Sequence, residues 1–463
     1  MLVAAIAALV FVLAGGAAVA LFLTRDTGPH YPKEWDARVT DIVKFDEATR
    51  GLKYKHPVKI EFMSEDDFTK TLTAEDGPTD EEKAQMQQFT AAYRALGLIG
   101  GDVDLLQQTQ DIQSGGTLAY YDPKTKVIRV RGTEMTPALR VTLAHEMTHV
   151  LQDQYFDLNR LEKIKDDGAQ TAFRAVVEGD AVGVENAYID QLSPADKQAY
   201  DDENQKSGDS SGYDKAPQVL VANFTSPYIV GPPFVATLKA KGGNPAVDEA
   251  IKTPPASEAA LLDLFTYLKN TTPLTVQPPD LGEGQTKIDA SGIGATTWYL
   301  MLARRLPAAD AIKSIDGWGG DSSLTYTETT GRVCVKARYQ GKTSADTDTM
   351  AALLDEWVAQ SPADTALTTR DGSVIELQSC DPGKDAVLPG TDRSVLAMEL
   401  LAVRLQIVQS GYEQGAKASR VECFSDQVVA GLSLDDLSDT ADQAQVKQKV
   451  ASLEQSAALT CPS

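Results

Sequence analysis

The chain has 463 residues, a formal net charge of −23 and a hydrophobic fraction of 42%. This length allows two or three domains with a sizeable core, and the composition is that of a folded protein rather than a disordered one. Nucleic acids and anionic membrane surfaces are bound through clustered Lys and Arg. The strongly acidic balance therefore argues against nucleic acid as a partner.

The N-terminus begins with an uncharged apolar stretch over residues 2–23, which ends at Thr24 and Arg25. Its length matches a helix that crosses a bilayer, and this predicts a transmembrane signal-anchor over residues 1–24. A cleaved signal peptide is the alternative, because residues 18–20 fit a small-residue cleavage site, but the apolar run continues beyond them. A short Pro/Gly linker over residues 25–34 would follow the anchor.

Apolar spacing in the N-terminal part predicts a mixture of helices and strands. Helical periodicity covers residues 35–52 and 86–97, and a further helix is expected to start after a cap at Ser64. Alternating apolar residues over 58–62 predict a strand between the first two helices. An α+β fold is therefore expected rather than an all-helical one.

A hairpin and a capped helix follow. Residues 118–121 and 127–130 are strand-like and flank turn chemistry in between, which predicts a β-hairpin. Thr136 and Pro137 then supply a cap and a first-turn proline, so a helix is expected to begin at Pro137.

That helix contains the chain's clearest functional motif, an H-E-x-x-H formed by His145, Glu146 and His149. Residues four apart lie on one face of a helix, so both histidines can bind one metal ion while Glu146 handles a proton beside them. The chain has only 4 histidines. A chance match is therefore expected roughly once in 400 such chains.

A catalytic zinc ion takes three protein ligands and leaves a fourth position for water, so a third ligand should lie downstream. Glu178 is the best candidate, because it lies at the margin of the buried face of a second predicted helix. Gly179 beside it would let that helix approach a neighbour closely. Glu185, further along the same helix, is the alternative ligand.

Residues 142–158, followed by the segment 177–181, resemble the gluzincin class of zinc metallopeptidases. More narrowly, they are similar to a little-characterised group of bacterial exported or membrane-anchored zinc proteases, and the resemblance covers roughly residues 35–340. It implies a zincin-like fold, with a small mixed sheet, a hairpin, the H-E-x-x-H helix and a helical second half. It also implies one Zn²⁺ ion bound by His145, His149 and Glu178, and a protein or peptide substrate.

The chain departs from the gluzincin pattern at one position. Many gluzincins have an Asp four residues after the ligand Glu, where it orients a histidine, but here that residue is Val182. Asp180 is expected to point elsewhere on the helix. Asp153, four residues after His149, is the alternative for this orienting role.

All four cysteines, Cys334, Cys380, Cys423 and Cys461, lie in the last third of the chain, in no C-x-x-C pair. An even number at wide spacing after an export segment indicates two disulfides formed in an oxidising compartment, although four cysteines allow three connectivities. Pairing of Cys334 with Cys380 and of Cys423 with Cys461 is favoured, because each disulfide then closes a loop within one structural unit. The disulfides predict that the body lies outside the cytoplasm.

The remaining segments carry weaker signals. Residues 317–321 form a glycine cluster without the Lys and Ser/Thr of a phosphate loop, so tight turns around a packed Trp318 are expected. Tyr228 lies in an expected Pro/Gly loop, where packing is the commoner role of a tyrosine, and donation to an oxyanion is the alternative. The zinc metallopeptidase-like domain is expected over residues 35–340, and residues 341–463 are expected to form a mostly helical, disulfide-bonded accessory module.

The sequence therefore predicts a membrane-anchored zinc metallopeptidase with its catalytic body outside the cytoplasm. Zinc would lower the pKa of a bound water towards about 7, and Glu146 would take the proton as general base. The alternative is a noncatalytic extracytoplasmic envelope protein on a zincin scaffold, which binds a protein or a cell-wall partner. A purely structural zinc site is a weaker hypothesis, because such sites usually have four ligands, often cysteines.

Overall fold

The computed structural model describes residues 31–72, 79–114, 117–208 and 213–462. The predicted anchor at 1–24, and the linker up to residue 30, lie outside the described residues. The fold is mixed α+β with two sheets, as expected from the sequence. It divides into two compact units.

Unit 1 consists of Met1–Thr79, Gln107–Lys163 and Asp180–Ala216. Its described elements are α1 (Thr40–Arg50) with a preceding 3-10 turn (Ala37–Val39), β1 (Lys59–Met63), α2 (Glu65–Leu72), β2 (Ala119–Asp122), β3 (Val127–Arg131), α5 (Pro137–Phe156), a 3-10 turn (Leu158–Lys163) and α7 (Pro194–Gly208). The strand order is β1-β3-β2, with β1 parallel and β2 antiparallel to β3. The predicted hairpin is therefore confirmed, and β2 is an edge strand.

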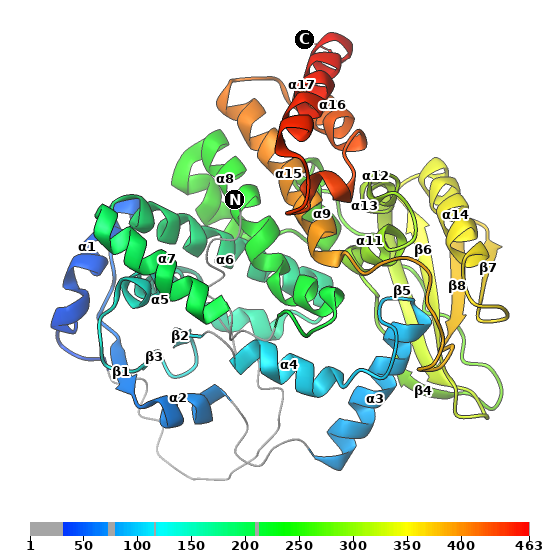
Figure 1. Ribbon diagram of the computed structural model, residues 1–463, viewed down its shortest axis with the longest axis horizontal. Helices are drawn as coiled ribbons and strands as arrows, with labels where there is room; N and C mark the ends of the chain where they lie inside the picture. The colour runs from blue at the N-terminus through cyan, green and yellow to red at the C-terminus, as the bar shows by residue number, and fades with distance from the viewer. Residues whose placement is uncertain (1–30, 73–78, 115–116, 209–212, 463) are drawn as a thin grey trace. The chain divides into compact units, whose positions relative to one another are not determined.

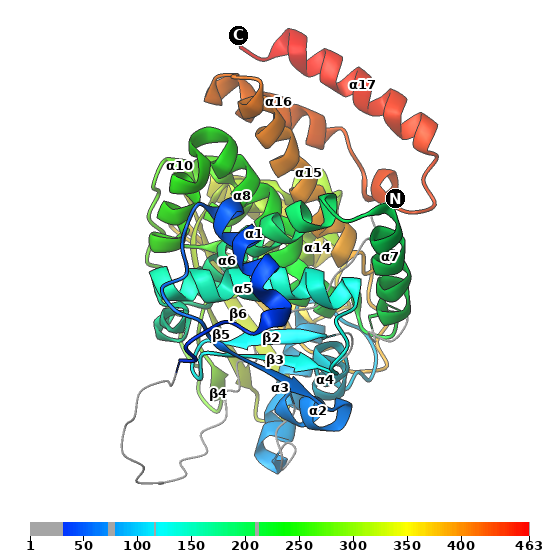
Figure 2. The same ribbon diagram turned by 90° about the vertical axis from the view of Figure 1, so that its left-hand side faces the viewer.

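Helix α5 begins at Pro137, as predicted, and the side chain of Thr136 accepts a hydrogen bond from the backbone N–H of Leu139. It lies along β2 and packs against α1, as Figure 2 shows. The core between these elements is apolar and includes Ile128 and Val130 from the sheet and Leu143 and Val150 from the helix. Because this core surrounds the helix, most of the α5 side chains are buried, including those of the H-E-x-x-H motif.

Two helices cross from one unit to the other: α4 (Leu105–Ser114) and α6 (Asp167–Asp190). In α6 the first half, up to Gly179, belongs to unit 2, and the second half, from Asp180, belongs to unit 1.

Unit 2 consists of Asp80–Leu106, Ile164–Gly179 and Pro217–Ser463. Its sheet is antiparallel, in the order β4-β5-β6-β8-β7. The strands are β4 (Thr286–Asp289), β5 (Trp318–Thr327), β6 (Val333–Gly341), β7 (Ala366–Asp371) and β8 (Val374–Cys380). Figure 1 shows α14 (Ser344–Ala359) over β6, β8 and β7, which it contacts.

The helices of unit 2 are α3 (Asp80–Ala95), α8 (Gln218–Lys252), α9 (Glu258–Leu262), α10 (Leu264–Leu268), α11 (Ala295–Ala303), α12 (Ala308–Ala311), α13 (Lys313–Asp316), α14 (Ser344–Ala359), α15 (Ser394–Glu413), α16 (Ala418–Ala430), a 3-10 turn (Leu434–Leu437) and α17 (Gln443–Thr460). The boundary predicted after residue 340 falls at the end of β6, within a sheet whose strands come from both sides of it.

The predicted Pro/Gly loop around Tyr228 is wrong, because these residues lie inside α8. Four prolines occur within this helix, and its backbone departs from helical geometry at Gly243. Packing of α8 against α15 stabilises a helix that its local sequence disfavours. In the part of the chain that the structure describes, α8 is also the one helix long and apolar enough to cross a membrane, but 61% of its apolar window is buried inside the protein.

The predicted turns over residues 317–321 are also wrong, because β5 starts at Trp318. Glycine is required here by close packing rather than by turns: a Cβ on Gly320 would lie 2.3 Å from the carbonyl oxygen of Leu274. Trp318 is buried, as expected.

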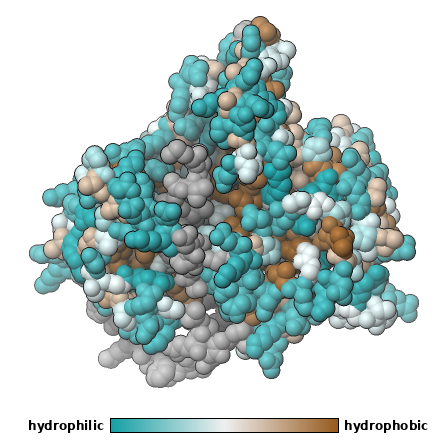
Figure 3. All heavy atoms as spheres, in the orientation of Figure 1, coloured by the Kyte–Doolittle hydropathy of each residue, from teal (hydrophilic) through white to brown (hydrophobic). Residues whose placement is uncertain are grey.

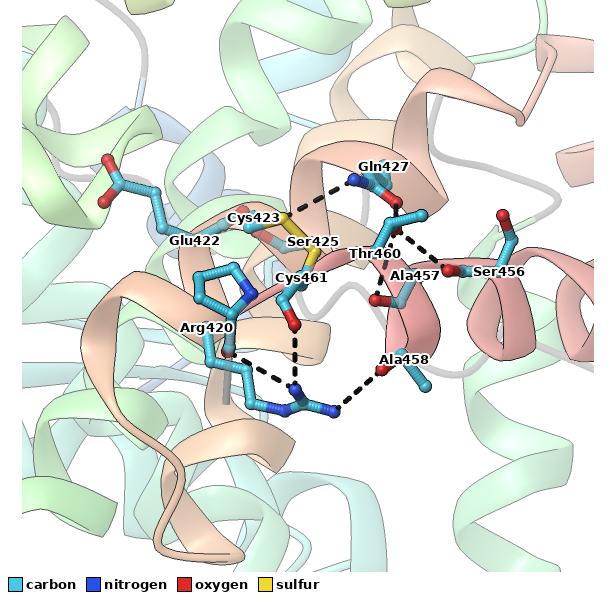
Figure 4. Close-up of a disulfide and its surroundings, with 11 residues drawn as sticks. Arg420, Glu422, Cys423, Ser425, Gln427, Ser456, Ala457, Ala458, Thr460 and Cys461 are labelled. Carbon is cyan, nitrogen blue, oxygen red and sulfur yellow. Dashed lines mark hydrogen bonds between the residues drawn. A yellow bond between two sulfur atoms is a disulfide. The ribbon is translucent and has the colours of Figure 1, made fainter.

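The predicted disulfide pairing is confirmed. Cys334 of β6 pairs with Cys380 at the directly opposite position of β8. The second disulfide joins Cys423 of α16 to Cys461 at the end of α17, as Figure 4 shows. Arg420 reinforces this end by donating to the carbonyl oxygens of Ala458 and Cys461, at 3.4 Å and 3.1 Å, so α17 is held to α16 covalently and by hydrogen bonds.

The surface is largely hydrophilic, as expected for a chain with many charged residues. Hydrophilic side chains cover most of the face drawn in Figure 3. The sequence has 66 Asp and Glu against 43 Lys and Arg. Such a surface favours solubility and disfavours binding to polyanions.

Candidate metal centre

The two histidines of the motif lie on one face of α5. Their Nε2 atoms are 3.0 Å apart, and the side chains of His145 and His149 are 1% and 0% exposed. Two imidazole nitrogens that bind one tetrahedral zinc ion at about 2.0–2.1 Å would lie about 3.3 Å apart. The observed spacing is close to that value.

The opposite nitrogen of each ring has a defined partner. Nδ1 of His145 lies 2.8 Å from a carboxylate oxygen of Glu185. Nδ1 of His149 lies 2.8 Å from Oε1 of Gln152, whose Nε2 donates to Asp180. Because both partner oxygens accept hydrogen bonds, the network places a proton on Nδ1 of each ring. In that tautomer Nε2 is the nitrogen of each ring that can bind a metal ion, and the two Nε2 atoms are close enough to bind the same ion.

The carboxylate of Glu178 lies close to these two nitrogens. It is fully buried, and ligand atoms of His145, His149 and Glu178 all lie within 4.8 Å of one another. Helix α6 is tied to α5 by Asp180 and Glu185, which lie two and seven residues beyond Glu178. Seven residues are two helical turns, so Glu178 and Glu185 share one face of α6, and both are directed towards α5.

Glu146 is held beside the histidines by the edge strand. Its side chain is fully buried, and Oε2 accepts a hydrogen bond of 2.7 Å from the backbone N–H of Tyr121 in β2. In an antiparallel pair, alternate residues direct their backbone groups away from the partner strand. Ala119, two residues earlier, therefore directs its N–H and C=O to the same side of β2, which is the side that faces α5.

Within unit 2, helices α6 and α8 meet directly after Glu178. A Cβ on Gly179 would lie 2.3 Å from the carbonyl oxygen of Gly231, and a Cβ on Gly231 would lie 2.2 Å from that of Ala175. The prediction that Gly179 allows a close helix approach is therefore confirmed. The phenol of Tyr228, one turn before Gly231, contacts the carboxylate of Glu178, and burial together with this negative charge raises the pKa of Tyr228 well above its ordinary value.

The structure changes the role of three acidic residues considered from the sequence. Glu185, the alternative ligand, instead accepts the hydrogen bond from His145. The orienting role suggested for Asp153 is wrong, since this carboxylate binds the phenol of Tyr121, the Lys126 ammonium and the backbone of Leu158. It fastens the hairpin to α5 and does not touch His149.

Asp180 was expected to point elsewhere on the helix, and it does not contact a histidine directly. It is 5% exposed, accepts a 2.8 Å hydrogen bond from Gln152 and pairs with Arg50 of α1 at 2.9 Å. Sequence reasoning missed both Arg50 and Gln152. The available signal was helical spacing: Gln152 lies three residues after His149, on the same face of α5.

A second group of metal-binding residue types, Glu328, Cys334 and Cys380, has no thiolate to offer, because its cysteines form a disulfide. Comparison of the chain with family models, curated proteins and solved structures finds no match. Function therefore has to be inferred from the geometry of the centre itself.

Proposed function

We propose that this protein is a zinc-dependent metallopeptidase, which hydrolyses peptide bonds. The observation that carries the proposal is the convergence of two imidazole nitrogens, from His145 and His149, with the Glu178 carboxylate. Two histidines, one carboxylate and an open position are the ligand set of catalytic zinc. A structural zinc site would need a fourth ligand, usually Cys, and all four cysteines form disulfides.

The arrangement of elements supports a gluzincin-type centre on a zincin-like fold. A small mixed sheet ends in the edge strand β2, α5 carries the H-E-x-x-H motif beside that edge, and the next long helix, α6, carries Glu178. This order is what the resemblance to gluzincins implies. The chain has Val182 where many gluzincins have an Asp that orients a histidine. Glu185 nevertheless supplies a carboxylate that supports His145.

When bound, zinc supplies a Lewis acid that lowers the pKa of water and polarises the scissile carbonyl. We assign the role of general base to Glu146, because it follows His145 directly in α5 and its carboxylate accepts a hydrogen bond from the N–H of Tyr121. It takes the proton from the attacking water and delivers it to the leaving amine. Complete burial of Glu146 strengthens these charge interactions relative to water.

Strand β2 supports an extended peptide as the substrate. Its side towards α5 carries the backbone groups of Ala119 and Tyr121, of which the N–H of Tyr121 is bonded to Glu146. A peptide can add to such an edge as a further strand, so main-chain hydrogen bonds hold the scissile bond in register. Protein or peptide chains therefore fit the centre better than small compact substrates do.

The cellular setting is proposed from the ends of the chain. Two disulfides indicate an oxidising compartment, and the apolar stretch over residues 2–23 is suited to anchor the body to a membrane. We propose a single-pass membrane protein with its catalytic body outside the cytoplasm.

Replacing Glu146 with Gln tests the proposed reaction. Glu146→Gln preserves shape and a hydrogen-bond acceptor for Tyr121 but removes the base, so hydrolysis of an unfolded protein substrate should fall by about 10²–10⁴. Zinc content should stay that of the wild type. Glu134→Gln, an exposed residue in the loop before α5, is the matched control and should retain full activity.

Two outcomes would count against the proposal. Wild-type activity in Glu146→Gln would remove this residue from the reaction. A wild-type chain that binds zinc and cleaves none of a broad set of unfolded proteins would favour the noncatalytic envelope protein on the same scaffold.

A further inference from the structure

The two ligand histidines are supported in chemically different ways. His145 donates directly to a carboxylate, that of Glu185, at 2.8 Å. His149 donates to an amide, that of Gln152, which in turn binds Asp180. All the supporting side chains lie in unit 1 and are at most 6% exposed.

An ionised carboxylate accepts hydrogen bonds and cannot donate them, so Glu185 alone is sufficient to hold the proton on Nδ1 of His145. An amide offers both an acceptor and a donor. Gln152 could therefore present either its Oε1 or its Nε2 to His149. With Nε2 facing the ring, Nδ1 would become the acceptor, the ring proton would move to Nε2, and the metal-binding lone pair would be lost.

Asp180 removes this ambiguity. Its Oδ2 accepts a hydrogen bond of 2.8 Å from Nε2 of Gln152, which leaves Oε1 as the only group of the amide that faces His149. Arg50 donates to the same oxygen at 2.9 Å. A buried carboxylate is costly unless it is paired, and Arg50 provides the pairing charge.

We propose that Arg50, Asp180 and Gln152 form a positioning relay that selects the metal-binding tautomer of His149. The relay joins α1, α6 and α5, so the tautomer of one ligand depends on the packing of three helices. It rests on the proposed function, in which His149 is a zinc ligand. Asp180 is a positioning residue here, because it acts through Gln152 and touches neither zinc nor substrate.

Asp180→Asn is the direct test, since an amide at 180 allows Gln152 to turn around. The dissociation constant for zinc, measured on the full chain by competition with a chelator, should rise about 10–100-fold. Asp153→Asn is the matched control: its carboxylate is similarly buried, but it binds Tyr121 and Lys126 instead of the relay, so the constant should change less than about 2-fold.

A second readout does not depend on zinc. Nitrogen NMR of the imidazole rings in the metal-free chain distinguishes the two tautomers, and only 4 histidines have to be assigned. The relay predicts that Asp180→Asn populates the Nε2–H tautomer of His149 and leaves His145 unchanged. If Asp180→Asn fails to fold, Gln152→Met, which keeps shape and removes the amide, should produce the same change at His149.

A chain in which Asp180→Asn and Gln152→Met keep the wild-type tautomer of His149 and the wild-type zinc affinity would overturn the relay. Failure of the wild-type chain to bind zinc would overturn the proposed function instead. In that case the imidazole spectra of the metal-free variants would still decide whether the relay selects the tautomer.

Discussion

Two regions of the molecule bury carboxylates, and the groups around these carboxylates differ. At the candidate metal centre, the carboxylate of Glu178 lies near Arg174 and Tyr228 and is grouped with ligand atoms of His145 and His149 within 4.8 Å. In unit 2, Glu258 and Asp321 face hydrogen-bond donors. A buried carboxylate that is surrounded only by hydrogen-bond donors is satisfied as a structural group. A buried carboxylate that is grouped with two imidazole nitrogens also matches a set of metal ligands.

In unit 2, the buried carboxylates of Asp321 and Glu258 accept hydrogen bonds from nearby N–H groups. Asp321 accepts from the backbone N–H groups of Ile293 and Gly294 and from the indole of Trp298, at 3.0–3.1 Å. Glu258 accepts from the N–H of Thr296 at 2.9 Å. These bonds fix the loop that leads into α11. Burial alone is therefore no sign of a metal site, and the chemical type of the facing atoms decides.

The largest expected effect is on zinc affinity, which should depend on the candidate metal centre and not on the buried carboxylates of unit 2. His149→Phe removes one of three ligands, so zinc affinity should fall by more than about 10³. Glu258→Gln, in the structural region, should leave zinc affinity unchanged. Calorimetric titration of the full chain with zinc measures the affinity of both variants. A wild-type isotherm for His149→Phe would show that His149 is not a zinc ligand.

The next largest effect is on stability. A metal that binds only the folded state adds about 4 kcal/mol to the free energy of unfolding when its free concentration is 1,000 times the dissociation constant. Chelation should remove this contribution from the wild type and from Glu258→Gln. Thermal unfolding with and without chelator measures it, and a zinc-dependent shift that persists in His149→Phe would contradict the centre described here.

A smaller effect is expected at the crossing of α6 and α8. Gly179→Ala places a Cβ 2.3 Å from the carbonyl oxygen of Gly231, which should cost about 1–3 kcal/mol of stability and weaken zinc binding through Glu178. Gly183→Ala lies on the same helix with no atom within 4 Å of the added Cβ, so it should be neutral or slightly stabilising. Equal behaviour of the two variants in urea unfolding and zinc titration would show that the crossing does not position Glu178.

The smallest expected effect is the pH dependence of stability that the buried carboxylates of unit 2 produce. Burial raises the pKa of Glu258 from 4.5 to about 7 and that of Asp321 from 3.8 to about 6. The folded state therefore binds protons more tightly than the unfolded state, so these groups favour folding at low pH, and this advantage is lost as pH rises from about 4 to 7.

Unfolding of unit 2, followed by its buried tryptophans in urea, should become easier over that range. Glu258→Gln should flatten the dependence by on the order of 1–3 kcal/mol. A pH profile that is the same in this variant as in the wild type would show that Glu258 is already ionised in the folded protein.

Local signals predicted the element that carries the candidate site. The cap at Thr136, the proline at 137 and the apolar stripe placed α5 correctly, and turn chemistry placed the hairpin. Disulfide pairing followed from the spacing of the cysteines. These features depend on residues close in the chain or on a simple topological argument.

The support of the ligands could not be predicted in this way. Arg50 and Asp180 are 130 residues apart, and no periodicity links them. Helix α8 could not be predicted from local sequence either. Its prolines predict a loop, but packing against α15 stabilises the helix. Tertiary contacts override local preference where burial is extensive.

The zinc content of the full-length chain, purified in detergent and measured by elemental mass spectrometry, tests the central claim most directly. The convergence of His145, His149 and Glu178 predicts about one tightly bound zinc ion per chain, lost when His149 is replaced by Phe. Less than about half an equivalent in the wild type, after exposure to zinc and removal of the excess, would contradict a metal centre at this place.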